Sequence, residues 1–135
     1  MKDALTAMFL ADARLNALVQ GRVHWGKQPA QVEGRPYLNL TVISDPRTYH
    51  MKGRSALRRT RVQVDAWAAL YDDADAAETA ISALDEASAT VRDGIRFQGI
   101  FVAGSRDVTD EGVDGETLFR ASVDLDIHWN EETNQ

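Results

Sequence analysis

The stretch Leu-Phe-Arg-Ala-Ser-Val-Asp-Leu-Asp-Ile-His-Trp-Asn, residues Leu118–Asn130, decides the fold of this 135-residue chain. Apolar and polar side chains alternate along it, which is typical of a β-strand with one buried and one open face. The apolar positions are Phe119, Ala121, Val123, Leu125, Ile127 and Trp129. We therefore expect a long strand whose apolar side covers a hydrophobic core.

Other segments upstream also have strand patterns. Arg59–Ala68 alternates with the same period of two, and Tyr37–Ser44 follows a proline, which suits the first position of a strand. Arg22–Trp25 is a short strand candidate. A further strand is expected over Ile95–Arg106, with a bulge near Gly99, because the apolar positions change parity there.

Two helices are expected, over residues 3–19 and over Asp72–Val91. The first has an apolar stripe, and the second is rich in alanine. Asp72 and Asp73 are expected to supply its cap and first-turn acid. The order α-β-β-β-α-β-β predicts an α+β fold, a two-layer sandwich of a mainly antiparallel sheet with two helices packed on one face. We expect one domain over residues 1–135, with a polar tail at 131–135.

The connection from Asp45 to Arg58 is unusual, because hairpin loops normally have about 2–5 residues and this one has about fourteen. Six of the fifteen basic residues lie between Arg47 and Arg61 with no acid among them, whereas seventeen of the twenty-one acids follow Arg61. This long basic loop, about 45–58, is either a plain surface loop or an interaction arm. The candidate subunit or partner interface residues are Arg47, Tyr49, His50, Lys52, Arg54, Arg58 and Arg59.

Composition excludes several classes of protein. The chain has no cysteine, which excludes disulfide-built modules, thiolate catalysis and Cys-ligated zinc. No apolar run approaches the roughly 20 residues of a membrane span, and the N-terminus does not have the pattern of a signal peptide. We therefore expect no membrane contact. The net charge of −6 argues against a protein that reads nucleic-acid sequence.

Asp124, Asp126 and His128 are the arrangement that we weigh as a candidate enzyme or metal site. They alternate on one side of the expected strand, about 6.5–7 Å apart per step, too far for neighbours to share one ion easily. We interpret them as a solvated outer face and expect no catalytic residue, no metal and no cofactor. A small enzyme or metabolite-binding domain that uses these three side chains is the alternative.

Three parts of the chain resemble a known family. They are Gly21–Val23 after the opening helix, Arg35–Leu40 running into Ser44–Arg47, and Arg59–Trp67 followed by Tyr71–Ala74 and the alanine-rich helix. These residues resemble the small tail-completion or tail-terminator proteins of long-tailed phages and of gene transfer agents. The resemblance implies a structural virion protein that is not an enzyme.

The resemblance also implies a place in the particle. Such proteins cap the tail tube as a ring, usually a hexamer, and offer the opposite face to the head connector. The implied partners are copies of the same chain, the tail tube protein and a head connector or head-completion protein, with only non-specific contact to DNA in the lumen. The implied location is the head–tail junction of the virion, after assembly in the bacterial cytoplasm. A head-completion adaptor at the same junction, or a separate binding module that recruits an acidic partner, remains an alternative.

Overall fold

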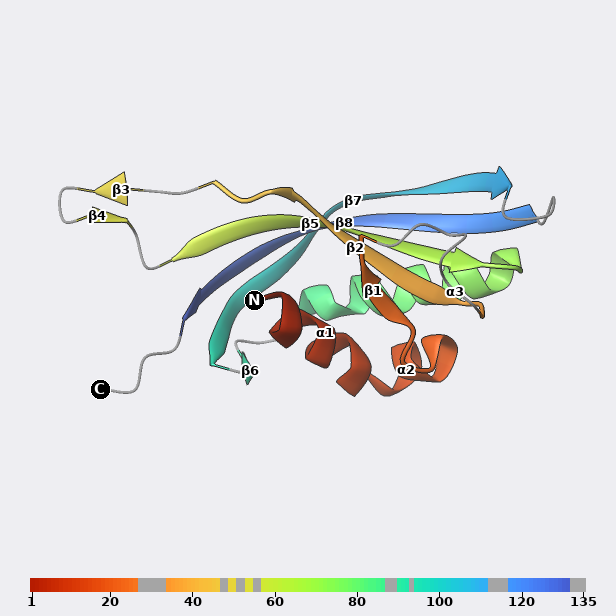
Figure 1. Cartoon of the computed structure of the whole chain (residues 1–135), viewed down its shortest axis with the longest axis horizontal. Coiled ribbons are helices and arrows are strands. Elements are labelled where there is room, and N and C mark those ends of the chain that lie inside the picture. Colours follow the sequence, from red (N-terminus) through yellow and green to blue (C-terminus); the bar gives the residue numbers. More distant parts are fainter. Residues whose placement is uncertain are drawn as a thin grey trace.

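A six-stranded sheet with helices on one side forms the body of the molecule (Figure 1). This computed structural model describes residues 1–26, 34–46, 49–50, 53–54, 57–86, 90–92, 94–111 and 117–131. The strands of the sheet are β1 (Val23–Trp25), β2 (Tyr37–Ser44), β5 (Arg58–Ala68), β6 (Thr90–Arg92), β7 (Ile95–Glu111) and β8 (Thr117–Glu131). Their order is β1-β2-β5-β8-β7-β6, and every neighbouring pair is antiparallel except β1 with β2. The predicted α+β class is confirmed.

The strand that decides the fold, β8, lies in the middle of the sheet. It pairs with β5 from Arg58↔Trp129 to Ala68↔Phe119 and with β7 along the whole length of that strand. Its alternating apolar side chains face the helices and, apart from the partly buried Phe119, are buried, as the sequence predicts. The expected boundaries of β2, β5 and β8 lie within one residue of the observed ones.

The N-terminal helical segment is two helices instead of one, α1 (Lys2–Ala11) and α2 (Ala13–Val19). Asp12 separates them, because its backbone is extended at φ −76° and ψ 117°. Its Oδ1 accepts a hydrogen bond of 3.0 Å from the Leu15 N–H, so that Asp12 caps the start of α2. The prediction of one continuous helix over 3–19 was wrong at this residue.

The second predicted helix was too long. Helix α3 spans Tyr71–Ser82 and is followed by one 3₁₀ turn, η2 (Ala83–Glu86). Thr90–Arg92 is strand β6, which pairs with Ile95–Phe97 at the start of β7. The N-cap residue is Leu70, so the expected capping by Asp72 was also wrong, although Asp72 and Asp73 do lie in the first turn.

The hydrophobic core lies between the sheet and the three helices. Fully buried side chains of α1 and α2, such as Phe9 and Leu15, pack with those of α3 and of the central strands. Central strand residues in this core include Val64, Leu125 and Ile127. A second, smaller cluster of Tyr37, Trp67 and Leu118 is also buried. No helix among the described residues is long and apolar enough to cross a membrane.

Strand β7 contains two irregularities in its pairing with β8. The register shifts between Phe97 and Gly99 and again between Val102 and Gly104. The first shift confirms the bulge expected near Gly99. Each extra residue changes which side chains of β7 face the helices.

The long connection between β2 and β5 contains strands of its own. β3 (Tyr49–His50) and β4 (Gly53–Arg54) pair with each other in a separate two-stranded sheet. Figure 1 shows this small sheet beyond the start of β5, at the end of the molecule opposite the start of α3. We call the segment between Asp45 and Arg58 the arm. The long basic loop expected at about 45–58 thus contains two short strands.

Candidate functional site

The sheet face opposite the helices, which we call the outer face, has most of the polar side chains of the sheet. Because strand residues alternate, the polar positions of β5 lie there directly opposite those of β8. The register places Arg61 opposite Asp126, Gln63 opposite Asp124 and Arg59 opposite His128. β7 adds Arg106 and Phe101 on the other side of β8.

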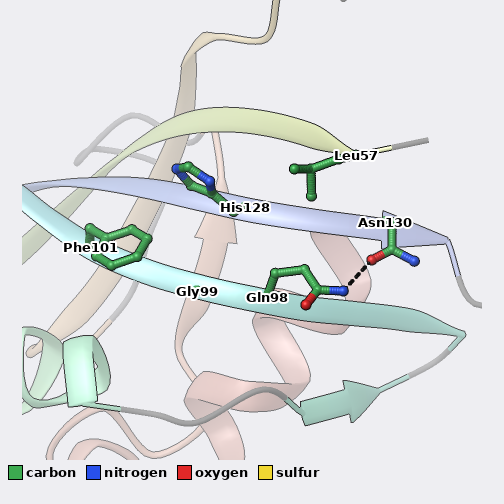
Figure 2. A pocket seen from close by; sticks show the side chains of 6 residues that line it. All are labelled: Leu57, Gln98, Gly99, Phe101, His128 and Asn130. Atoms are coloured by element: carbon green, nitrogen blue, oxygen red, sulfur yellow. Dashed lines mark hydrogen bonds between the residues drawn. The ribbon is translucent and has the colours of Figure 1, made fainter. Parts of the chain in front are cut away.

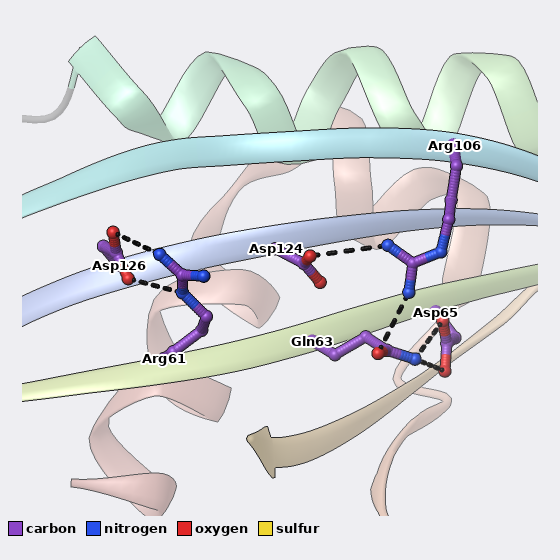
Figure 3. Close-up of polar contacts among 6 residues, drawn as sticks. All are labelled: Arg61, Gln63, Asp65, Arg106, Asp124 and Asp126. Carbon is purple, nitrogen blue, oxygen red and sulfur yellow. Dashed lines mark hydrogen bonds and ion pairs between the residues drawn. The ribbon is translucent and has the colours of Figure 1, made fainter. Parts of the chain in front are cut away.

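An ion pair joins β5 to β8 on this face. Arg61 donates from Nε to Asp126 Oδ1 at 2.9 Å and from Nη2 to Asp126 Oδ2 at 3.1 Å, which is the two-point geometry that guanidinium and carboxylate groups favour (Figure 3). The hydrogen bond from Arg61 lowers the pKa of Asp126 below its ordinary value. The same contact raises the pKa of Arg61.

A second group of polar contacts joins all three central strands. Arg106 of β7 reaches Asp124 of β8 at 3.4 Å and donates to Gln63 Oε1 of β5 at 3.1 Å. Gln63 in turn donates to both carboxylate oxygens of Asp65, at 3.1 and 3.0 Å (Figure 3). Asp124 and Asp126 are thus bound by arginines of neighbouring strands, and Asp65 is bound by an amide of its own strand.

The three residues of the enzyme alternative are held apart by these contacts. Asp124 and Asp126 bind different arginines, and the His128 ring lies edge-on to Phe101, with centroids 5.2 Å apart. In the part of the chain that the structure describes, no group of three His, Asp or Glu side chains is placed to hold a metal ion. The structure gives these residues cross-strand contacts and does not bring them together at a common point.

A hollow of about 470 Å³ lies on the outer face next to the arm. It is lined by Leu57, Gln98, Gly99, Phe101, His128 and Asn130. Figure 2 shows the Phe101 and His128 side chains at one end of it and a hydrogen bond of 2.7 Å from Gln98 to Asn130 at the other. A Cβ on Gly99 would lie 2.8 Å from the Phe101 ring, so glycine allows this ring to lie across the strand.

A smaller hollow of about 320 Å³ also lies at the arm end of the outer face, beside the end of β2. Its lining includes Ile43, Arg59, Arg61 and Asp126. Arg59 is exposed and, among the described residues, makes no hydrogen bond or ion pair. Ile43, Leu57 and Phe101 are each about half exposed. This end of the outer face therefore combines exposed apolar groups with a free cation.

The root of the arm is held by a chain of polar contacts on the helix side of the sheet. Arg58 Nη2 lies 2.6 Å from Asp45 Oδ2, and Thr60 donates to Asp45 Oδ1 at 3.0 Å. Trp129 Nε1 donates to Thr60 at 2.9 Å, and the Arg58 guanidinium lies 4.5 Å from the Trp129 ring centroid. These contacts join the first and last residues of the arm to the core.

The opposite end of the outer face is closed by aromatic rings. Tyr37 and Trp67 stack with centroids 6.3 Å apart and an interplanar angle of 13°. Arg35 lies over the Tyr37 ring and Arg120 over the Trp67 ring, at 5.0 and 5.1 Å. Burial raises the pKa of Tyr37 to about 12. This end contributes to stability and leaves little side-chain area for a partner.

The seven interface residues predicted from sequence have different environments. Arg58 belongs to the root of the arm, and its neighbour Arg59 lies on the outer face. The backbones of Tyr49, His50 and Arg54 form β3 and β4. Arg47 and Lys52 lie outside the described residues.

Sequence reasoning missed Asp45, Thr60 and Phe101. Phe101 was detectable as a large apolar residue out of phase after the bulge, but the contacts of Asp45 and Thr60 depend on strand register.

The fold and this surface define a class: a small two-layer α+β domain whose distinctive parts are an arm and a polar outer sheet face. The family model for tail completion protein gp17 matches residues 3–129. The chain therefore belongs to the tail completion protein gp17 family.

Comparison with solved structures gives a consistent fold. The chain is similar to a protein in the virion of a native gene transfer agent particle, with a TM-score of 0.65 and 24% identity. The match covers 96% of this chain and 94% of that one. A search of curated proteins gave no significant match. The predicted relationship to tail-completion proteins is confirmed by the family model, and the structural match agrees with the fold of this chain.

Proposed function

We propose that this protein caps the tail tube as a hexameric ring and joins the tail to the head connector. In this role it acts through contact surfaces and performs no catalysis. Membership of the tail completion family supports the location at the end of the tail. The ring, the tube protein and the connector are the partners that we propose.

The observation that carries the proposal is the arm. Its two short strands pair only with each other in the described structure, whereas its root is fixed by the Asp45–Arg58 ion pair and by Thr60. A projecting element with a fixed root can reach a neighbouring subunit or the tube while the body keeps its fold. We propose that Tyr49, His50, Arg54 and the adjacent Arg47 and Lys52 make these contacts.

DNA is a secondary partner in this proposal. The arm and the outer face carry several arginines, but the chain as a whole has a net charge of −6. Contact with DNA that passes through the ring is therefore non-specific and electrostatic.

The test is a mass measurement by light scattering on the purified chain, alone and mixed with its tail tube protein, followed by electron microscopy of the mixture. We expect a ring or a ring bound to tube ends. A monomer that never associates with the tube contradicts the proposal. Binding to the head connector without any binding to the tube would instead assign the chain to head completion.

A further inference from the structure

Two exposed surfaces of opposite charge lie at opposite ends of the molecule. The first, which we call the basic patch, is the arm end of the outer face with Arg59, Ile43, Leu57 and Phe101. The second, the acidic patch, is the start of α3 with Leu70, Tyr71, Asp72 and Asp75, all exposed. Figure 1 shows the start of α3 and the arm end of β5 toward opposite ends of the long axis.

The charges of both patches are available to a partner. Among the described residues Arg59 forms no ion pair, and neither do Asp72 and Asp75. The other outer-face arginines, Arg61 and Arg106, already bind carboxylates of their own chain. Arg59 is thus an exposed cation of this face that makes no hydrogen bond or ion pair among the described residues and can bind a partner.

Each patch also has apolar side chains beside its charges. Leu70 is 63% exposed, and Tyr71, Leu57 and Phe101 are each about half exposed. Tyr71 is held in place by a hydrogen bond of 2.8 Å to Asp107, so its ring is presented in a defined position. Exposed apolar groups ringed by charge are typical of protein contact sites.

We propose that the basic patch of one chain binds the acidic patch of a second copy, an inference that rests on the ring proposed above. Two basic patches repel each other, so a contact between identical surfaces is unfavourable, whereas unlike patches attract. A contact between two different patches of one chain is head-to-tail and propagates from copy to copy until the ring closes. The basic patch lies on the outer face of the sheet, and the acidic patch lies in the helix layer toward the other end of the molecule. This placement suits a head-to-tail contact.

The experiment uses two charge reversals at exposed positions, Arg59→Glu and Asp75→Arg. Arg59→Glu makes both patches negative, whereas Asp75→Arg cancels the charge of Asp72 and leaves the acidic patch without a net negative charge. Each variant alone is therefore expected to raise the dissociation constant for self-association by about tenfold. An equimolar mixture restores opposite charges at every contact, because Glu at 59 meets Arg at 75 and the unchanged Arg59 meets the unchanged Asp75. We therefore expect the mixture to assemble as the unmodified protein does.

The matched control is Arg14→Glu, at an exposed position of α2 outside both patches. It is expected to leave the mass unchanged, and circular dichroism checks that all variants fold. Masses are measured alone and in the presence of tail tube polymers.

Three results contradict the pairing of these patches while leaving the ring proposal intact, provided that the unmodified chain assembles. The first is normal assembly of both single variants, and the second is failure of the mixture to assemble. The third is normal self-association of Arg59→Glu with loss of tube binding, which would assign the basic patch to contact with the tube. Absence of any assembly by the unmodified chain would contradict the proposed function itself.

Discussion

Arg58 and Asp45, the two residues that bound the arm, form an ion pair with 2.6 Å between Nη2 and Oδ2. Both side chains are mostly buried, and the Arg58 guanidinium also lies on the Trp129 ring. The pair thus joins the ends of the arm to each other and to the core. A substitution in this pair therefore changes the contacts at the root of the arm and leaves the residues of the arm itself unchanged.

The substitution Asp45→Asn is expected to lower the free energy of unfolding by about 1–2 kcal/mol, because Arg58 loses its charged partner while the amide oxygen still accepts from Thr60. Urea denaturation followed by tryptophan fluorescence measures the change. Ser44→Ala, at the neighbouring exposed position, is the control and is expected to change stability by less than about 0.5 kcal/mol. Equal midpoints for Asp45→Asn and the unmodified chain would show that the pair does not stabilise the fold.

The Arg61–Asp126 pair is expected to make stability depend on acid pH. Its hydrogen bond lowers the pKa of Asp126 in the folded protein below the unfolded value near 3.8. The stabilisation is therefore present above about pH 4 and is lost as pH falls through the lowered pKa. Asp126→Asn should remove this part of the pH dependence, as measured by urea midpoints between pH 7 and pH 2. Parallel curves for the two proteins across this range would contradict the assignment.

Two phenylalanines on the same strand should respond differently to truncation. Phe97 is 2% exposed in the core, and Phe101 is 51% exposed on the outer face. Phe97→Ala is expected to cost about 3–5 kcal/mol of stability through the cavity it leaves. Phe101→Ala should cost less than about 1 kcal/mol. Thermal unfolding of both variants checks this, and a similar loss for each would mean that the Phe101 ring is covered in solution.

Tyr37 is expected to control stability at alkaline pH. Burial raises its pKa to about 12 from an ordinary value of 10.0, so the folded state favours the neutral phenol. This stabilisation is complete below about pH 10 and is lost as pH rises to about 12. Tyr37→Phe should be nearly neutral at pH 7, because the hydroxyl has no hydrogen-bond partner among the described residues. Above pH 10 it should unfold at a higher urea concentration than the unmodified chain, and the same midpoint there would contradict burial of the phenol.

The strands were predictable because their pattern repeats over many residues. β2, β5 and β8 each alternate over eight or more positions. A repeating pattern of this length predicts closely where each strand begins and ends. The break at Asp12 was not predictable from the apolar stripe, because one extended residue leaves most of that stripe in place. The end of α3 was missed because alanine-rich sequence favours helix, while the three residues of β6 are too few to show a period.

The candidate site was less accessible to sequence reasoning than the fold. The concentration of basic residues singled out both Arg58 and Arg59. Their different environments follow from alternation at the start of β5, which places one on each side of the sheet. The Arg61–Asp126 contact joins residues 65 positions apart and depends on strand register. Sequence reasoning therefore identifies which segment matters and cannot give the partners of its side chains.

The closeness of Asp45 and Arg58 has a consequence for how this domain can vary. Because the ends of the arm meet, residues 46–57 form an insertion whose removal leaves β2 and β5 antiparallel neighbours that a short turn can connect. The sheet, the helices and the buried core are complete without it. Arms of different length or sequence can therefore be grafted onto one unchanged body, so that the body and its attachment to a particular particle can diverge independently.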